Sequence, residues 1–307
     1  MKVIHAANEL NQSSRKVCLA IGVFDGVHLG HQQIIRQTIS DARQHDATAL
    51  VVTFDRHPNA IVAPGHVPPL IYSPEQKLRA IESLSVDAML EIRFDQAFSQ
   101  KSGETFIREL AADFGKIHSL CVGADFVFGH KRSGNVALLQ KLGVELNFLV
   151  HGLAAVSLDG QVVSSTRIRE TIRAGNFNAA SQMLGRPYAI SGPVVTGDKL
   201  GRQLGFPTAN LDVTNLTLPP NGVYSAVTRL NGRLYRAALN IGFRPTLGSN
   251  QPQLRVEAHI LDFSEDIYGK ELELEMGDKL RDERRFASPA ELAAQIARDV
   301  AAVRASA

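Results

Sequence analysis

Two histidines stand three positions apart where a predicted buried strand meets a predicted helix. Residues 17–24 form a continuous apolar run, and His28 and His31 follow in a glycine-containing turn that leads into a helix over residues 29–44. Glycine lets a backbone approach a phosphate closely, and a helix N-terminus offers N–H donors and a positive dipole end. Two imidazoles on one side of a first helical turn suit the charge that builds up during nucleotidyl transfer. The alternative is that both histidines only cap the helix or lie on the surface.

Two later segments could complete the same phosphate site. Residues 123–134 follow an apolar run and form a glycine-rich loop with a carboxylate, two aromatic rings and two cations. These are Asp125, Phe126, Phe128, Lys131 and Arg132. Residues 164–169 bring hydroxyl groups to a helix start, followed by guanidinium groups, and such a combination grips pyrophosphate. Taken singly, the hydroxyl run is equally well explained as a helix N-cap and the basic loop as a solvated turn. The expected pyrophosphate contacts are Ser164, Ser165, Thr166 and Arg169.

A second set of residues, in the C-terminal half, could bind a nucleotide with a metal ion. A glycine-rich stretch with lysine and arginine is a plausible phosphate cradle, although it lacks the Gly-Lys-Ser/Thr of a Walker A motif. Thr208 and Asn210 lie two apart, so in an extended chain both face one way, and their oxygen atoms are ligands that Mg²⁺ prefers. Alone, this segment could be a simple turn. The expected cradle consists of Gly197, Lys199, Gly201 and Arg202.

Glu257 is the candidate general base of this second set. It lies on the polar side of an alternating strand predicted over residues 253–263, where a carboxylate could accept a proton from a substrate hydroxyl. The alternative is a surface salt bridge with Arg255 or with a lysine.

The elements that must position the first set alternate between strands and helices up to about residue 185. Several predicted strands are continuously apolar, which is typical of parallel strands buried on both faces. This pattern predicts a doubly wound α/β domain, over residues 1–185, with ligands at the carboxyl ends of the strands. The predicted strands are 17–24, 47–54, 88–94, 117–123 and 144–150, and the predicted helices are 29–44, one beginning at the capping box 73–76, and 103–114.

From residue 186 the predicted elements are short strands separated by glycine, proline and asparagine. Asn231-Gly232 between two apolar runs predicts a tight β-hairpin. The last helix begins with the capping box 288–291 and carries an apolar face. We therefore expect a small antiparallel β-barrel with a C-terminal helix over residues 186–307. The apolar face of the helix is predicted to be Leu292, Ile296, Val300 and Val303.

The composition of the chain gives no support for a nucleic-acid-binding, membrane or secreted protein. The chain has 307 residues, of which 44% are hydrophobic, and a net charge of +2, so nothing suggests binding to nucleic acid or a membrane. Cys18 and Cys121 lie in apolar runs and are expected to be buried, reduced thiols. No apolar stretch approaches the ~20 residues of a membrane span, and no signal peptide is evident. These features predict a soluble cytoplasmic protein, without indicating its oligomeric state.

The strings at residues 22–31, 123–129 and 164–169 resemble the adenylyltransferase half of bacterial bifunctional riboflavin kinase/FMN adenylyltransferases, the FAD synthetases. The resemblance implies a Rossmann-like nucleotidyltransferase fold with His28 and His31 as its signature histidines. Residues 55–58 resemble a further family segment, with Arg56 where the family usually has proline, and Ala124 is a second departure. Among substrate contacts the resemblance adds Gly22, Phe24, Asp25, Gly30 and His57.

The strings at residues 205–210, 240–246, 256–260 and 280–283 resemble the riboflavin kinase half of the same family. The resemblance implies that Thr208 and Asn210 bind Mg-ATP, that Glu257 is the general base, and that Arg281 lies near the flavin.

The implied function is ATP-dependent phosphorylation of riboflavin to FMN, followed by adenylylation of FMN to FAD and pyrophosphate, with Mg²⁺ as cofactor. One alternative is a monofunctional riboflavin kinase whose adenylyltransferase domain is impaired, with Arg56 and Ala124 as the suspect positions. The other is a non-catalytic regulator that binds flavin or RNA.

Overall fold

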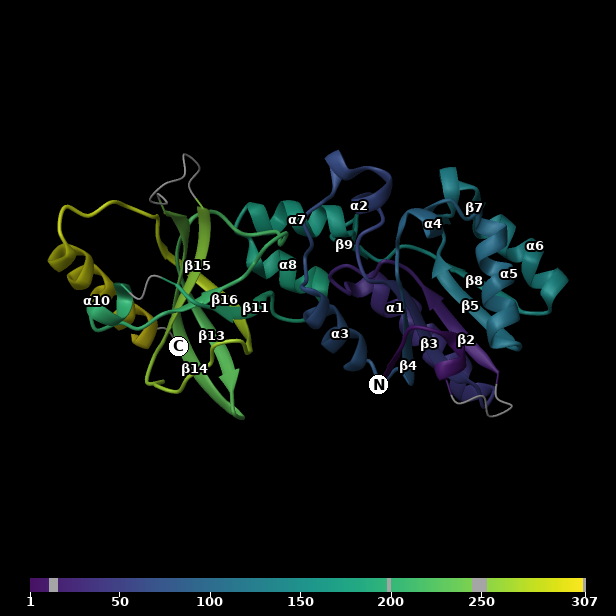
Figure 1. Ribbon diagram of the computed structural model, residues 1–307, viewed down its shortest axis with the longest axis horizontal. Helices are drawn as coiled ribbons and strands as arrows, with labels where there is room; N and C mark the ends of the chain where they lie inside the picture. The colour runs from purple at the N-terminus through teal and green to yellow at the C-terminus, as the bar shows by residue number, and fades with distance from the viewer. Residues whose placement is uncertain (11–15, 198–199, 245–252, 306–307) are drawn as a thin grey trace. The chain divides into compact units, whose positions relative to one another are not determined.

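The computed structural model describes residues 1–10, 16–197, 200–244 and 253–305, and its contacts divide the chain into two compact units (Figure 1). The N-terminal unit comprises Met1–Pro69 and Pro74–Ser165, and the C-terminal unit comprises Leu70–Ser73 and Thr166–Ala307. The predicted domain boundary after residue 185 would instead leave helices α7 (Ser165–Arg173) and α8 (Phe177–Leu184) with the first domain, and it stays a prediction.

The N-terminal unit is built on a six-stranded sheet in the order β1-β4-β3-β2-β5-β8. All the neighbouring strands run parallel, as the apolar runs predicted. The chain moves outward from β2 through β3 to β4 and then returns to the other side of β2, so the order reverses between β2 and β5. The strands are β1 (Lys2–Ile4), β2 (Val17–Ile21), β3 (Thr48–Phe54), β4 (Ala88–Ile92), β5 (Ile117–Gly123) and β8 (Leu149–Leu153).

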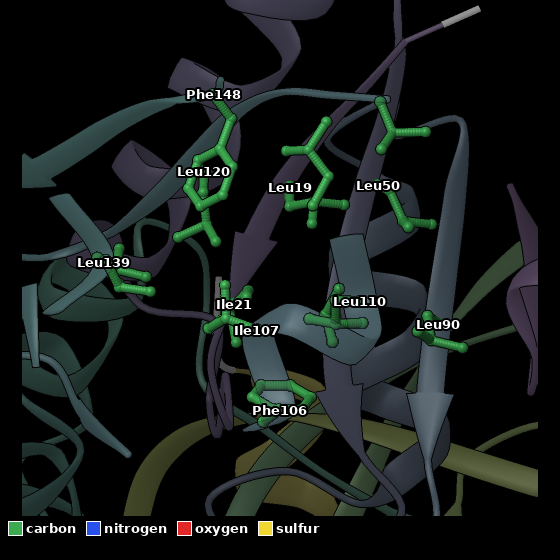
Figure 2. Packing of buried hydrophobic residues seen from close by; sticks show 14 of the residues in the cluster. Leu19, Ile21, Leu50, Leu90, Phe106, Ile107, Leu110, Leu120, Leu139 and Phe148 are labelled. Carbon is green, nitrogen blue, oxygen red and sulfur yellow. The ribbon is translucent and has the colours of Figure 1, made fainter. Parts of the chain in front are cut away.

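Helices cover both faces of this sheet. On one face Phe106, Ile107 and Leu110 of α5 pack against Leu19 and other strand residues in a continuous apolar core (Figure 2). Helix α1 packs against β2, β3 and β5 on the other face. The bounds are α1 (Leu29–Gln44), α2 (Asn59–Val62), α3 (Pro74–Glu82), α4 (Gln96–Ser99), α5 (Gly103–Phe114) and α6 (Val136–Leu146), with shorter elements η1 (Ala7–Glu9), η2 (Pro64–His66), η3 (His130–Arg132), β6 (Val127–Phe128), β7 (Gly134–Asn135), β9 (Ser157–Leu158) and β10 (Gln161–Val162).

The strand predicted over residues 144–150 is wrong in its first half. Residues 136–146 form α6, whose first turn is capped by the Asn135 side chain, which accepts the Leu138 N–H at 2.9 Å. The helix ends at Asn147, which has the left-handed φ of 59°, and the strand begins only at Leu149. Val144 is 88% exposed, so its apolar character reflects neither a buried strand nor a buried helix face.

The C-terminal unit contains a closed antiparallel barrel in the order β11-β12-β15-β14-β13-β16, as predicted. The Asn231-Gly232 hairpin is confirmed: both residues have positive φ, and Leu230 pairs with Arg233 across the turn. The strands are β11 (Ala189–Val195), β12 (Ala209–Leu211), β13 (Gly222–Leu230), β14 (Arg233–Arg244), β15 (Gln253–Ile260) and β16 (Glu271–Arg281), with a short α9 (Leu200–Gln203) before β12.

The C-terminal helix α10 (Pro289–Ala305) packs against β13 and β14 (Figure 1). Half of its predicted capping box forms, since Ser288 Oγ accepts the Glu291 N–H at 3.2 Å, while the Glu291 carboxylate accepts the Ala287 N–H at 3.0 Å. The predicted apolar face is only partly right. Val303 is buried, but Leu292, Ile296 and Val300 are half-buried, and the other two buried residues of the helix are Gln295 and Asp299.

Both cysteines are buried and free, as predicted. Burial raises the pKa of the Cys121 thiol to about 12 and also raises the pKa of Cys18. Among the helices that the structure describes, none is both long and apolar enough to span a membrane.

Candidate active sites

The turn between β2 and α1 holds unusual backbone. Phe24 and Val27 have φ values of 54° and 40°, and Gly26 has 78°. Such values are costly for a bulky or β-branched residue, and they persist where the surroundings enforce them, often at functional sites. Here Val27 is fully buried, and its carbonyl accepts the Gln32 side-chain amide at 2.9 Å. The turn is therefore held in one conformation at the carboxyl end of a central strand.

His28 and His31 form one unit on this turn. His28 is the N-cap of α1, and its Nδ1 accepts the His31 N–H at 3.4 Å. The two rings stack with centroids 3.6 Å apart, and the Phe24 and His31 rings form a T-shaped pair with centroids 5.2 Å apart. A Cβ on Gly30 would lie 3.2 Å from the His28 ring, so glycine makes room for it. His28 therefore does cap the helix, and this is compatible with a phosphate site, because capping fixes the ring at the helix N-terminus.

The structure brings part of the predicted hydroxyl run to this turn. Ser165 Oγ donates to the backbone carbonyl of Asp25 at 3.1 Å, and Ser164 precedes it. Asp25 is itself buried, and a Cβ on Gly22 would lie 3.0 Å from the Phe24 ring.

Thr166 and Arg169 follow Ser165 in α7. Both belong to the C-terminal unit, which begins again at Thr166. The Arg169 side chain is buried.

A cavity of about 680 Å³ in the N-terminal unit is lined mainly by aromatic rings. Ile21 and Phe54, the last residues of β2 and β3, line it, so it lies at the carboxyl ends of the strands. The centroids of successive rings are 5.1 to 6.3 Å apart, a spacing typical of favourable aromatic contacts. Such a cavity suits a flat ring system. Its rings are Phe54, Phe94, Phe98, Phe106, Phe126 and Phe128.

Sequence reasoning found only the last two of these rings, as part of the predicted glycine-rich loop. A signal was available, because Phe54 and Phe94 each end an apolar run that was predicted as a strand.

Of the other predicted contacts in this unit, Arg132 lines the same cavity. Asp125 is exposed on the loop after β5. His57 is half-buried, and its Nδ1 accepts the Asn59 N–H at 3.1 Å, just before the cavity-lining segment that begins at Pro58.

The two departures from the family pattern both have ordinary structural partners. Arg56 donates to one Asp55 oxygen at 2.7 Å and 3.0 Å. Burial pushes the pKa of Asp55 upward, but the bonds from Arg56 and the Phe94 N–H outweigh it and hold that pKa below its usual value. The Ala124 N–H donates to Leu153 at 2.8 Å, which continues the pairing of β5 with β8.

Lys77 is a residue that sequence reasoning missed. Its Nζ donates to the Phe54 carbonyl at 2.8 Å and lies 3.4 Å from Thr53 Oγ1, which in turn donates to the Val23 carbonyl at 3.1 Å. Burial lowers its pKa, against the opposing effect of nearby carboxylates including Asp25. Lys77 thus connects α3 to the turn after β2. A lysine within a predicted helix carried no signal of this role.

The C-terminal unit gathers four of its predicted site residues around one cavity of about 230 Å³, which Asn240 also lines. These four residues are Gly201, Thr208, Glu257 and Arg281. Glu257 on β15 pairs with Asn210 on β12 and with Asn240 on β14. Glu257 is only 8% exposed, so the part of the alternative that places it on the protein surface is wrong.

Glycines let the preceding loop approach Thr208 and Asn210. A Cβ on Gly197 would lie 2.3 Å from the Asn210 side-chain nitrogen, and one on Gly201 would lie 3.3 Å from Thr208 Oγ1. Arg202 and Thr208 line a neighbouring cavity of about 210 Å³. The predicted phosphate contact Lys199 lies outside the described residues.

Three oxygen-bearing side chains belong to this part of the site, although Asn210 lines a separate cavity of about 540 Å³ with Gly197 and does not line the Glu257 cavity. Thr208 supplies a hydroxyl, Asn210 an amide and Glu257 a carboxylate, and hard oxygen donors of this kind suit Mg²⁺ that arrives with nucleotide phosphates.

Two family models match the chain, FAD synthetase over residues 10–167 and riboflavin kinase over residues 184–307. The bifunctional riboflavin kinase/FMN adenylyltransferase of Escherichia coli (strain K12) is 38% identical over 301 residues, which cover 97% of this chain and 96% of the relative. The enzyme of the same name from Pseudomonas fluorescens is 36% identical over 305 residues, or 99% and 97% of the two chains. The chain belongs to the bifunctional riboflavin kinase/FMN adenylyltransferase family.

Each site falls within one of the two matched regions. The histidine turn and the aromatic cavity lie in the FAD synthetase region, and the Glu257 cavity lies in the riboflavin kinase region. The fold is also found in the crystal structure of a macrolide-efflux protein from Streptococcus pneumoniae, with a TM-score of 0.80, 27% identity and 99% of both chains covered.

Proposed function

We propose that the two sites carry out successive steps of FAD synthesis. The C-terminal unit phosphorylates riboflavin with ATP to give FMN, and the N-terminal unit adenylylates FMN with a second ATP to give FAD and pyrophosphate. The observation that carries this assignment is that each matched family region contains its own cavity with suitable reactive groups.

In the kinase step Glu257 acts as general base. It accepts the proton of the riboflavin 5′-hydroxyl as that oxygen bonds to the γ-phosphorus of ATP and the bond to the β-phosphate oxygen breaks, releasing ADP. Thr208 and Asn210 hold the nucleotide with Mg²⁺, which neutralises charge on the phosphates when bound. Gly197, Lys199, Gly201 and Arg202 bind the phosphates, and Arg281 contacts the flavin.

In the adenylyl step a phosphate oxygen of FMN bonds to the α-phosphorus of ATP, and pyrophosphate leaves. The nucleophile is already anionic, so no general base is required. His28, His31 and the N-terminus of α1 stabilise the negative charge of the transition state. Ser164 and Ser165 receive the pyrophosphate, with Thr166 and Arg169 from the same sequence motif.

The flavin ring of FMN occupies the aromatic cavity. Its flat aromatic ring system matches the phenylalanine-lined volume, which is larger than the cavity beside Glu257. Arg132, His57 and Asp125 surround the phosphates of the two substrates, along with the backbone at Gly22, Phe24, Asp25 and Gly30.

The direct test is a timed separation of flavins after the protein is mixed with riboflavin, ATP and Mg²⁺. FMN should appear first and then give way to FAD. If FMN accumulates and no FAD forms, and if supplied FMN is not converted to FAD either, the protein is a monofunctional riboflavin kinase. Bound flavin without any turnover would identify the regulator.

Two substitutions separate the sites. His28→Ala should abolish conversion of supplied FMN to FAD and leave riboflavin phosphorylation intact. Glu257→Ala should lower riboflavin phosphorylation by about 10²–10⁴-fold, the usual contribution of a general base, and leave adenylylation intact. Loss of both activities in either variant would contradict separate sites.

A further inference from the structure

Helix α10 turns two polar residues toward the barrel. Gln295, Asp299 and Val303 are its buried residues, and their spacing of four places them on one face. A carboxylate or an amide is costly to bury unless hydrogen bonds replace its hydration. The bonds that these two side chains make should therefore show why polar residues occupy a face that would otherwise be apolar.

Asp299 holds Arg281 of the riboflavin kinase site through two nitrogen atoms. Arg281 Nε donates to the two Asp299 oxygens at 3.0 and 3.1 Å, and Nη2 donates to Oδ2 at 2.7 Å. The Asp299 side chain is 7% exposed and that of Arg281 is 20% exposed. A two-nitrogen pair of this kind fixes the plane of the guanidinium group.

Gln295 in turn fixes Asp299. Its Nε2 donates to Asp299 Oδ1 at 2.7 Å. Its Oε1 accepts from Arg298 at 2.8 and 3.1 Å and from Arg284. Because two guanidinium groups hold the amide oxygen, the amide nitrogen is directed at the carboxylate.

Arg281 keeps donors for a ligand. A guanidinium group has five N–H donors. Nε and Nη2 donate to Asp299, and Nη1 donates to the Asp282 carbonyl at 3.0 Å. Within the part of the chain that the structure describes, one N–H on each of Nη1 and Nη2 makes no bond. Arg281 lines the cavity that also contains Glu257.

We propose that Asp299, oriented by Gln295, is a positioning residue of the riboflavin kinase site. It holds the long Arg281 side chain in one rotamer, so that the remaining donors meet acceptor atoms of the flavin substrate without a further loss of side-chain entropy on binding. This inference rests on the proposed kinase function of the Glu257 cavity.

The test compares two substitutions in the full-length chain. Asp299→Asn removes the charge and leaves one acceptor oxygen, and it should raise the KM for riboflavin by about tenfold, because bonds between charged partners are among the stronger ones. The KM for ATP and the adenylylation of supplied FMN should stay unchanged. The matched control is Asp262→Asn: Asp262 also forms a two-nitrogen pair with an arginine of α10, Arg304, but is 68% exposed and outside the cavity.

A double-mutant cycle shows whether Asp299 acts through Arg281. If it does, Asp299→Asn should have no further effect on the riboflavin KM once Arg281→Met is present. Additive effects, an unchanged riboflavin KM in Asp299→Asn, or an equal loss of both activities would overturn the proposal. Gln295→Met, which leaves the ion pair itself in place, should raise the riboflavin KM less.

The same variants distinguish the flavin contact of Arg281 from the positioning role of Asp299. If Arg281→Met alone leaves the riboflavin KM unchanged, the proposed flavin contact of Arg281 is wrong, and the positioning role of Asp299 is overturned with it. If Arg281→Met raises that KM and Asp299→Asn does not, only the positioning role is overturned. An unchanged KM for ATP in riboflavin phosphorylation shows in every case that the C-terminal unit, which contains all three residues, is folded.

Discussion

At the scale of single residues, Arg56 illustrates a departure from a family pattern that the structure explains locally. Its hydrogen bonds go to the neighbouring Asp55, and its side chain is 48% exposed. The other Asp55 oxygen accepts the Phe94 N–H at 2.9 Å, so Asp55 rather than Arg56 is bonded to a residue of the aromatic cavity.

We therefore expect Arg56→Ala to change the KM for FMN in adenylylation by no more than about twofold, because exposed ion pairs contribute little. Steady-state kinetics with supplied FMN would measure this. A large loss of FAD formation, with kinase activity intact, would mean that Arg56 contacts the substrate.

The same pair predicts a pH dependence. The pKa of Asp55 is lowered in the folded chain from its usual 3.8, so the pair stabilises the fold above that value, and the contribution disappears as the pH falls through the lowered pKa. Any stability difference between Arg56→Ala and the parent should accordingly shrink toward strongly acidic pH.

At the scale of elements, three glycines allow close packing beneath the aromatic cavity. Gly103 begins α5, and Gly134 lies in β7 opposite Phe128 of β6. A Cβ on Gly103 would lie 2.6 Å from the Cα of Gly134, and one on Gly134 would lie 2.6 Å from the Phe128 ring. Gly129, with a φ of 74°, brings the loop against the backbone of Gly103. Phe128 therefore keeps its place only if these positions have no side chain.

Gly134→Ala should displace the Phe128 ring and raise the KM for FMN in adenylylation several-fold, while riboflavin phosphorylation is unchanged. Gly65→Ala is the matched control, because a Cβ there would meet nothing within 4 Å. Kinetics of both activities in both variants would measure the effect. Unchanged FMN affinity in Gly134→Ala would argue against Phe128 as part of the FMN site.

Elements with two independent local signals were predicted best. Helices α1 and α5 begin and end at the predicted residues, because apolar periodicity and a distinct first turn agree in both. Helix α6 was missed because its apolar run continues almost to β8, and only the left-handed Asn147 separates helix from strand. Strand β1 has three residues and pairs with β4, a partner far along the chain, so no local pattern indicates it.

At the scale of the whole molecule, the C-terminal unit includes a segment from the N-terminal half of the sequence. Leu70 exchanges backbone bonds of 2.7 Å with Asn215 and Thr217 and forms a parallel bridge to Leu216. The Tyr72 hydroxyl accepts from Arg186 Nε at 2.9 Å, and its ring lies 5.0 Å from that guanidinium group. The kinase unit is therefore discontinuous in sequence.

Tyr72→Phe removes the hydroxyl and keeps the ring. We expect it to destabilise the C-terminal unit by about 1 kcal/mol, the net value of a typical hydrogen bond, and to lower the temperature of heat inactivation of the kinase activity by about 3 °C. The adenylylation activity of the variant should be inactivated at the same temperature as that of the parent protein. The measurement follows both activities in one heated sample, and an unshifted kinase inactivation temperature would contradict the expectation.

The sequence by itself determined the two fold classes, the family and the groups that react. The fold classes, the family and the reactive groups all follow from local information, namely apolar periodicity, turn residues and short motifs. In these motifs His28, Thr208 and Glu257 are close in sequence to the residues that orient them. Residue type is sufficient there, since a histidine at a helix start or a carboxylate on a strand has its chemistry whatever else surrounds it.

The tertiary structure alone decided what surrounds those groups. The aromatic cavity, Lys77 beneath the turn after β2, and the support of Arg281 by Asp299 all join segments distant in sequence, and each depends on side-chain packing that no periodicity encodes. Asp299 shows the physical reason most directly. A carboxylate on a helix is expected to face solvent, and the arginine brought to it by strand β16, together with Gln295, makes its burial favourable.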